Sequence, residues 1–340
     1  MMPTAATNVV CRFSDEVEQS ITVPPDQTVL EAALSADLPL LHQCRSGACG
    51  SCVARLVSGD VRMSTGTATS LLASEQSEGL RLLCVSNAHA DSVVEFDYPS
   101  TLSGPVRVSA FVDAVEWLAA DVVHLKLELA EDQWLDFRPG QFVRMRVPDT
   151  QDWRSYSMVS TADALPKMEF LVRCLPDGSM SNYLRDHAAR DQVVELEGPF
   201  GSFYLRDDMR AKQVMIAGGT GIAPMISMLD TIRHKSGRKP DVLLSFGCAD
   251  DSALFFTEEL DLRTFWMRTL ELRISLDRTG PDSQYPAGNP VAAVQADDVS
   301  SDTVAYLCGP PPMVEAAFAH LEGLGMKVEN IHAEQFLSSE

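Results

Sequence analysis

The chain has 340 residues, 45% hydrophobic and 22% charged, which is the composition of a globular protein with two or three domains. Its formal net charge of -21 argues against nucleic acid and anionic membrane surfaces as partners. Eight cysteines do not make a disulfide scaffold at this length, and no signal segment or membrane-length apolar run is evident, so we expect a cytoplasmic protein without membrane attachment.

The first segment, residues 8–98, predicts a compact α+β unit. Its expected elements are strands at 9–13, 20–23, 52–57 and 93–96 and a helix at 28–36. The helix carries apolar residues at helical spacing, and Asp26 or Thr28 is its expected cap.

Four cysteines in this segment carry the most specific signal. They are Cys44, Cys49, Cys52 and Cys84, which read C-x4-C-x2-C with 31 residues between the last two. This spacing is typical of a plant-type [2Fe–2S] cluster held by four thiolates. Two disulfides or a structural zinc are the alternatives, but zinc sites usually pair short C-x2-C knuckles, whereas three cysteines crowd one loop here. We therefore predict that the four cysteines are the metal ligands.

Residues 99–105 are a linker by composition, and an antiparallel β-barrel is expected after them. The expected strands are 106–115, 122–129, 141–147, 169–172 and 193–196. Turn residues such as Pro139 and Gly140 separate most of them.

Two motifs in the barrel segment indicate a flavin site. The first comprises Arg154, Ser155, Tyr156 and Ser157. An aromatic ring can stack on a flavin, a hydroxyl can donate to a ring nitrogen, and a guanidinium can bind phosphate. The second comprises Gly178, Ser179, Met180 and Ser181, and it opens an expected helix at 182–188 whose N-terminus can bind an anion. An ordinary strand and a plain N-cap are the structural alternatives.

The last segment alternates strands and helices, which predicts a parallel sheet in an α/β domain. The expected strands are 214–217, 242–246, 270–275 and 304–308, and the expected helices are 224–235, 258–266 and 312–324. A glycine-rich turn follows the first strand and comprises Gly218, Gly219, Thr220 and Gly221. Glycines allow the backbone to approach a pyrophosphate closely, although a simple packing loop is the alternative.

Two further positions complete the predicted nicotinamide site. Asp250, followed by Asp251, can accept a hydrogen bond from a ribose 2′-hydroxyl and repel a 2′-phosphate, which favours NADH over NADPH. A solvated loop is the alternative. At the end of the fourth strand, Cys308, Gly309 and Pro310 shape a crevice where ligands bind in open sheets. Cys308 is either a contact of the nicotinamide ring or a buried structural thiol.

Taken together, these motifs resemble the NADH-dependent reductase component of bacterial aromatic-ring-hydroxylating dioxygenases, with the benzoate and anthranilate dioxygenase reductases as the most similar subgroup. The resemblance covers nearly the whole chain. It implies three domains: a ferredoxin at 1–99, an FAD-binding barrel at 105–206 and an NAD-binding domain at 211–340. In a related subgroup the ferredoxin is C-terminal and the flavin is FMN, so the N-terminal ferredoxin implies FAD here.

The family's site residues follow by resemblance. Tyr156 would stack on the flavin, Ser157 would face its N5 atom, and Arg154 with Gly178–Ser181 would hold the FAD pyrophosphate. Tyr156, Ser157 and Cys308 would thus be the catalytic residues. A C-terminal acidic-x-Phe segment lies near the flavin in the family and corresponds to Glu334 and Phe336. Many relatives have Tyr-Glu-Lys-Phe there, whereas this chain has Ala-Glu-Gln-Phe.

The implied activity is electron transfer from NADH through FAD and the cluster to a separate terminal oxygenase, expected to be of the Rieske type. The chain itself lacks the alternating cysteine and histidine boxes of a Rieske centre, despite His42 near Cys44. The reductase of a soluble di-iron monooxygenase is the alternative enzyme. A non-catalytic iron–sulfur sensor is the alternative from another class, and it would not need the flavin and nicotinamide motifs.

Overall fold

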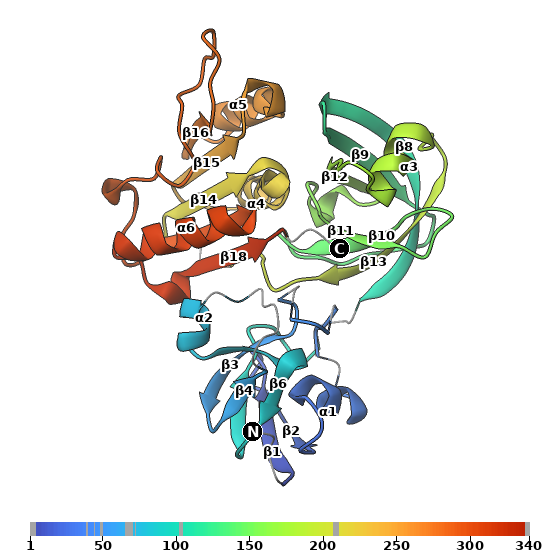
Figure 1. The fold of residues 1–340 in the computed structure, drawn as a ribbon, viewed down its shortest axis with the longest axis vertical. Coiled ribbons are helices and arrows are strands. Elements are labelled where there is room, and N and C mark those ends of the chain that lie inside the picture. The colour runs from blue at the N-terminus through green and yellow to red at the C-terminus, as the bar shows by residue number, and fades with distance from the viewer. Residues whose placement is uncertain are drawn as a thin grey trace. The chain divides into compact units, whose positions relative to one another are not determined.

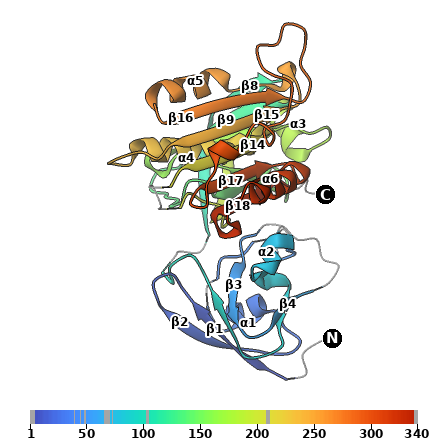
Figure 2. The same ribbon diagram turned by 90° about the vertical axis from the view of Figure 1, so that its left-hand side faces the viewer.

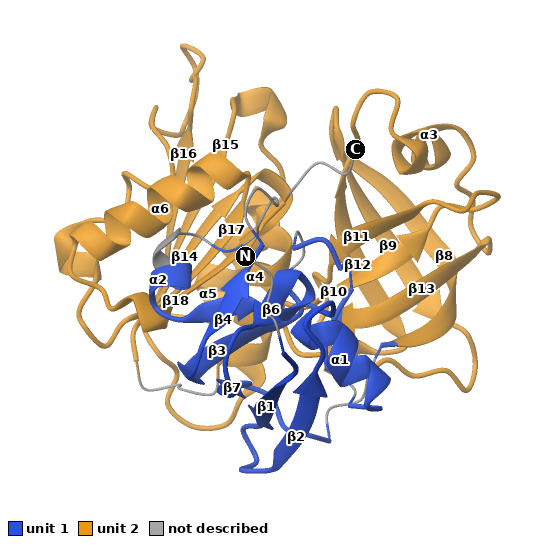
Figure 3. Ribbon diagram, turned by 60° about the horizontal axis from the view of Figure 1, so that its bottom comes forward, with its two compact units in different colours: residues 1–105, 200–202 blue, residues 106–199, 203–340 orange. Residues whose placement is uncertain are grey.

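The computed structural model describes residues 5–38, 40–43, 45–47, 50–64, 71, 73–101, 105–206 and 211–336. The chain divides into two compact units, residues 1–105 with 200–202 and residues 106–199 with 203–340 (Figure 3). Among the described residues, no helix combines the length and the apolar sequence that a membrane crossing requires.

The first unit is the predicted α+β unit, with a five-stranded sheet in the order β2-β1-β7-β3-β5 and a separate β4-β6 pair. Its elements are β1 (Thr7–Arg12), β2 (Glu18–Val23), α1 (Val29–Ser35), β3 (Val53–Ser58), β4 (Val61–Met63), α2 (Ala73–Ser77), β5 (Leu80–Leu82), β6 (Ser86–Ala88) and β7 (Ser92–Glu95). Thr28 and Glu31 form a reciprocal capping box at the start of α1, which satisfies backbone donors that a helix end leaves open. Thr28 is therefore the cap that the sequence left undecided between two residues.

The second unit begins with a six-stranded sheet in the order β11-β10-β13-β8-β9-β12, whose assigned pairings are antiparallel. Its elements are β8 (Val106–Ala119), β9 (Val122–Leu129), β10 (Phe142–Arg146), β11 (Trp153–Ser157), β12 (Lys167–Arg173), α3 (Ser179–Asp186) and β13 (Val193–Phe200). Met158, directly after β11, forms a bridge with Phe170 on β12, so the two edge strands meet and the sheet closes as a barrel.

The parallel sheet of the second unit has the order β16-β15-β14-β17-β18, and its pairings are all parallel (Figure 2). Its elements are β14 (Gln213–Gly218), α4 (Ile222–His234), β15 (Val242–Cys248), α5 (Thr257–Trp266), β16 (Leu270–Leu276), β17 (Val304–Gly309), α6 (Pro311–Gly323) and β18 (Ile331–Gln335). The strand order reverses between β14 and β17. In open α/β sheets this switch point is where ligands bind, at the carboxyl ends of the strands.

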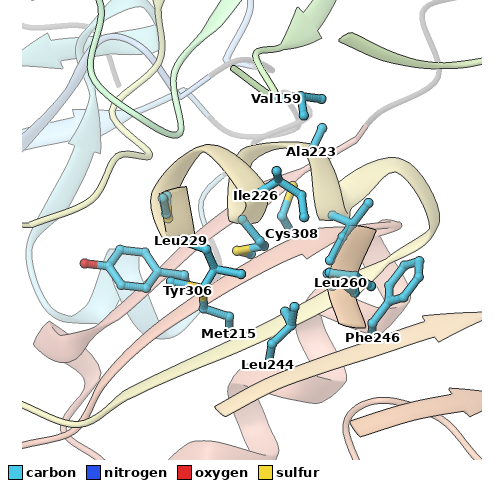
Figure 4. Packing of buried hydrophobic residues seen from close by; sticks show 14 of the residues in the cluster. Val159, Met215, Ala223, Ile226, Leu229, Leu244, Phe246, Leu260, Tyr306 and Cys308 are labelled. Atoms are coloured by element: carbon cyan, nitrogen blue, oxygen red, sulfur yellow. The ribbon is translucent and has the colours of Figure 1, made fainter. Parts of the chain in front are cut away.

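The barrel has its own hydrophobic core, and the core of the parallel sheet also includes several residues of the barrel segment, which fits the grouping of both parts (Figure 1) in a single unit. Val159, which follows β11, belongs to the same buried cluster as Ala223 and Ile226 on α4 (Figure 4). Ser227 on α4 also donates a hydrogen bond to the backbone carbonyl of Ser160 at 2.8 Å. Helix α4 therefore holds the end of β11 in place relative to β14.

The sequence predicted the fold class correctly, and the structure extends several elements. Helix α3 begins at Ser179 rather than at residue 182, with Gly178 as its N-cap. Five elements were not predicted, and all of them have three to five residues: β4, β5, β6, α2 and β18. Short elements carry too few residues for a periodic pattern, and their pairing is decided by tertiary contacts.

Gly140 tests the packing between barrel and parallel sheet. A Cβ there would lie 2.5 Å from Met228 Cε and 2.8 Å from the Phe203 carbonyl oxygen, at a backbone φ of +109°. Gly140→Ala should lower the unfolding temperature of the second unit by about 5 °C more than Gly237→Ala. Both variants place an alanine at a positive φ, but only Gly140→Ala also overpacks its surroundings, which lowers the free energy of unfolding by a further ~2 kcal/mol. Gly237 has a similar φ of +93° and open space around it. Equal shifts in a thermal unfolding scan would contradict this packing.

Candidate functional site

The cysteine loop in the first unit is shaped by residues with left-handed backbone conformations. Arg45, Gly47 and Gly50 have positive φ angles of 56°, 85° and 70°. Two of the three are glycines, which adopt such angles without steric cost. The loop can therefore turn tightly over the segment that carries the predicted ligands, of which Cys44 and Cys49 lie outside the described residues.

The structure brings the segments of the other two predicted ligands together. Cys52 is 3% exposed and Cys84 is 8% exposed, and both belong to the buried cluster of the first unit. The amide of Leu83, next to Cys84, donates to the Cys52 carbonyl oxygen at 3.1 Å. Two cysteine segments that are 32 positions apart in the sequence are thus held at one place in the fold, as a shared cluster requires.

The start of α3 fits a bound phosphate group. Its N-cap is Gly178, so no side chain satisfies the first amides of the helix. The Ser179 hydroxyl is buried and has no hydrogen-bond partner among the described residues. Ser181 is already engaged, because its hydroxyl accepts from the Leu175 amide at 2.9 Å. Unpartnered donors at a helix N-terminus are the arrangement that binds an anion such as the FAD pyrophosphate.

Strand β11 carries the first flavin motif along the edge of the barrel. Arg154 is about one-third exposed, donates to the Trp153 carbonyl oxygen at 3.0 Å, and lies 3.7 Å from Asp152. Tyr156 packs against the barrel core, and its burial raises the pKa of its phenol, so the ring stays neutral. The Arg154 guanidinium and the Tyr156 ring thus both belong to β11, the strand that carries the predicted flavin motif.

Ser157, at the end of β11, connects the barrel to the last strand of the parallel sheet. Its hydroxyl donates to Glu334 Oε2 at 3.2 Å, across 177 residues of sequence. Glu334 in turn lies opposite Cys308 in the β17–β18 register. One hydroxyl, one carboxyl and one thiol from three strands therefore meet beside the switch point of the sheet.

The ionisable groups at this place are held in their neutral forms. Burial raises the pKa of Glu334 to about 8, and the Ser157 hydrogen bond opposes that shift only in part. Burial, and then the proximity of Glu334, raise the pKa of the Cys308 thiol well above its usual range. Burial lowers the pKa of His332 to about 3, and its ring packs 5.5 Å from that of Tyr306. Near neutral pH this region therefore carries no charge on these three side chains.

The glycine-rich turn packs directly against the end of β17. A Cβ on Gly221 would lie 2.2 Å from the Cys308 carbonyl oxygen, and one on Gly309 would lie 3.1 Å from the Gly218 amide nitrogen. The two backbones approach so closely that only glycine fits. Thr220 is buried, and α4 begins one residue after Gly221. The turn therefore presents a helix N-terminus at the switch point, which suits a pyrophosphate.

Helix α6 and the C-terminal segment flank the carboxyl end of β17. Pro310 is the N-cap of α6, and further prolines start the helix. The Phe336 amide donates to the Gly309 carbonyl oxygen at 2.9 Å, so Phe336 follows β18 directly beside the Cys-Gly-Pro turn. Cys308 itself is fully buried in the core below α4 (Figure 4).

Asp250 is more strongly engaged than the sequence suggested. Its Oδ1 accepts from the amides of Ser252 and Ala253, and its Oδ2 accepts from Arg278 at 2.8 Å. The Ser252 hydroxyl, and then Arg278, hold the pKa of the Asp250 carboxyl below its usual value. Asp251 binds the next loop through Ser283 and Gly280. The Arg278 side chain is 75% exposed, so the Asp250 carboxylate is paired with a cation at the protein surface.

Three family models match the chain in the order of these sites. They describe a 2Fe-2S iron-sulfur cluster binding domain at residues 13–89, an oxidoreductase FAD-binding domain at 109–204 and an oxidoreductase NAD-binding domain at 215–318. The electron transfer component of anthranilate 1,2-dioxygenase from Acinetobacter baylyi is 31% identical, over 98% of each chain. The chain belongs to the family of oxygenase reductase components. The predicted resemblance and the predicted cofactor types, [2Fe–2S], FAD and NAD, are thereby confirmed.

Other relatives of this reductase serve different oxygenases. The reductase component of propane 2-monooxygenase from Mycolicibacterium smegmatis is 31% identical, over 95% of this chain and 96% of its own length. A solved structure of a cytochrome P450 reductase from Amycolatopsis is also 31% identical, with a TM-score of 0.72 over 96% of this chain and 98% of that one. This reductase is an oxidoreductase, and its relatives are named with a dioxygenase, a monooxygenase and a cytochrome P450.

Sequence reasoning missed some residues that the structure brings to the reductase's site. Tyr306, whose hydroxyl accepts from the Arg206 amide at 2.9 Å, is fully buried, and its ring packs 5.5 Å from that of the half-buried His332. Arg278 was missed as well, because its contact with Asp250 spans 28 residues and two loops. Of these, only His332 had a sequence signal, its position two residues before the acidic residue of the C-terminal segment.

The cluster ligands can be tested against another buried cysteine of the same unit. Cys84→Ser should remove the iron and the visible absorbance of the cluster, because a cluster that loses one of four thiolates is no longer held. Cys11→Ala is the matched control, since Cys11 is 0% exposed in the same core and has no predicted ligand role. Iron content and visible spectra measure both. Retention of the cluster by Cys84→Ser would show that the ligand assignment is wrong.

The Glu334 carboxyl should make stability depend on pH in a defined direction. Its pKa is about 8 in the folded chain against 4.5 for the ordinary group, so folding binds a proton between these values. This contribution is complete below pH 4.5 and falls as the pH rises to about 8, by at most about 5 kcal/mol. Glu334→Gln should abolish it, whereas Glu329→Gln, at an exposed site nearby, should not. Parallel pH curves of unfolding for wild type and Glu334→Gln would contradict the shift.

Proposed function

We propose that this reductase carries electrons from NADH through FAD and a [2Fe–2S] cluster to the terminal oxygenase of an aromatic-ring-hydroxylating dioxygenase, with a Rieske-type oxygenase as the partner. Relatives named as electron transfer components of anthranilate, toluate and 2-halobenzoate dioxygenases, each matched over at least 97% of this chain, support the proposal. The cysteine content and the thiolate-held cluster favour a reducing compartment, so the cytoplasm is part of the proposal.

The observation that carries the proposal is the Ser157–Glu334 hydrogen bond beside the switch point of the parallel sheet. It joins the strand of the flavin motif to the strand next to Cys308, so the two predicted cofactor sites adjoin. When bound, FAD accepts a hydride from a nicotinamide and releases its electrons one at a time, as a cluster needs them.

Each group of residues has a role in this proposal. Arg154 and the Gly178–Ser181 segment bind the FAD phosphates, and Tyr156 packs on the ring system. Ser157 and Glu334 form a neutral hydrogen-bonded pair at the reacting edge of the flavin, which keeps water and charge away from that edge.

The nicotinamide nucleotide is proposed to bind at two backbone segments, Gly218–Gly221 and Cys308–Pro310, with Phe336 beside them. Cys308 is proposed to contact the nicotinamide, which requires that its fully buried thiol becomes accessible when the nucleotide binds.

Preference for NADH rests on the Asp250–Arg278 pair. The Asp250 carboxylate repels a 2′-phosphate and pairs with Arg278, which could otherwise bind that phosphate.

The four cysteines Cys44, Cys49, Cys52 and Cys84 are proposed as the cluster ligands. The three domains at 1–99, 105–206 and 211–340 are proposed as one module for each cofactor.

A monooxygenase is the second candidate partner. Reductase components of propane 2-monooxygenases are as similar to this chain as the anthranilate dioxygenase component is. A di-iron monooxygenase therefore stays the alternative to the dioxygenase. The sensor alternative is weaker, because the flavin and nicotinamide cradles described above would have no use in it.

Reconstitution with defined oxygenases tests the choice of partner. The loaded reductase and NADH should support product formation with the terminal oxygenase of an anthranilate or benzoate dioxygenase at least about tenfold faster than with a propane monooxygenase or a P450, since specific partners differ by a few kcal/mol in docking. Reduction of cytochrome c by NADH is the control for an active reductase. Faster turnover with either other oxygenase would reject the dioxygenase assignment, while an inactive control would reject the reductase assignment itself.

A further inference from the structure

Helix α5 presents three large apolar side chains to solvent. Leu262, Phe265 and Trp266 are 43%, 80% and 47% exposed. They occupy one face of the second half of the helix, at i, i+3 and i+4. Single exposed apolar residues are common on protein surfaces, but three on one turn form a patch of the kind that marks an interaction site.

The inner face of α5 is fully used, so the apolar patch is not a packing defect. Leu260 is 0% exposed in the core. Arg263 is buried and ion-paired with Asp230 on α4 at 2.7 Å and with Glu259 at 3.3 Å. Figures 1 and 2 show α5 beside β16 at the outer edge of the parallel sheet. Among the described residues, Arg233 beside the Trp266 ring is the contact identified on the outer face, which is otherwise exposed.

Charge changes sign along this outer face. Glu258 and Asp261 are exposed in the first half of the helix. At the other end the guanidinium of Arg233 lies 4.8 Å from the centre of the Trp266 ring. Arg233 opens the segment 233–239, which carries four formally positive side chains and no acidic one, in a chain of net charge -21. The outer face of α5 is therefore acidic in its first half and apolar in its second half, and basic residues adjoin its C-terminal end.

We propose that α5 is a self-association surface through which two copies of this chain pair, helix against helix and antiparallel. Such a pairing is isologous, so the same patch serves both copies. An antiparallel pairing centred on Leu262, Phe265 and Trp266 brings the apolar residues of both copies together in the middle, and directs Glu258 of one copy toward the end of the other patch where Arg233 lies. A parallel pairing would bring like charges together. This surface is independent of the nicotinamide crevice and of the proposed electron path.

The dimer should be weak. Two helices of ten residues meet over about 15 Å, which buries less than the roughly 800 Å² per partner of a standard stable interface. We therefore expect a dissociation constant of roughly 10–100 µM, reached at high protein concentration. An acidic chain also repels its copies, which keeps the association from growing beyond the paired patch.

Sedimentation velocity of the FAD- and cluster-loaded protein tests the proposal. The weight-average sedimentation coefficient should rise between about 1 and 300 µM, and Phe265→Asp should weaken dimerisation at least about tenfold, because it places a charge in the apolar centre. Trp134→Asp is the matched control, since Trp134 is 64% exposed on the barrel and outside the patch. A wild-type chain that stays monomeric over this range, or equal effects of the two variants, overturns the proposal.

Charge reversal adds a test of the antiparallel direction. Glu258→Lys and Arg233→Glu should each weaken self-association. When two copies of the same variant pair, residue 258 of one copy and residue 233 of the other carry the same charge. A mixture of the two variants restores both opposite-charge contacts and should dimerise better than either alone. Unchanged flavin absorbance and unfolding temperature confirm that both variants fold. A mixture no better than its components would rule out antiparallel pairing through α5.

Discussion

The packing of α4 between the barrel and the parallel sheet is the constraint on which the rest of the second unit depends. Val159 from the barrel and Ala223 and Ile226 from α4 share one buried cluster, and the Ser227–Ser160 hydrogen bond lies beside it. Because the side chains interdigitate at interior density, the end of β11 cannot shift without opening a cavity. Ser157 is therefore held where its hydroxyl reaches Glu334 on β18.

The electrostatics of this region follow from the same burial. Enclosing Glu334, Cys308 and His332 costs less when all three are neutral, and their pKa values are displaced in the directions that keep them so. Hydride and electron transfer need a dry, preorganised environment more than a strong acid or base, since the cofactors supply the chemistry. A neutral hydroxyl–carboxyl pair at the meeting point of two cofactor sites meets that need.

Local sequence signals were sufficient for the fold class and for the types of cofactor. The cysteine spacing, the R-S-Y-S strand and the G-G-T-G turn each depend on neighbours within a few residues, and their chemistry can be read directly. Glycine at 221 illustrates the limit, because the sequence shows a flexible turn, whereas the reason for glycine is a backbone oxygen of Cys308 that lies 87 residues away. The Asp250–Arg278 pair and the protonation of Glu334 likewise depend on long-range contacts and burial. No periodic pattern encodes these.

The central claim is that the nicotinamide, flavin and cluster sites form one electron path in a single chain. An anaerobic titration of the loaded protein with NADH, followed by visible absorbance, tests it most directly. The account predicts that the flavin and iron–sulfur bands both bleach, with an uptake of about three electrons per chain. Bleaching of the flavin bands alone, or of neither set of bands in a protein that carries the cluster, would contradict it.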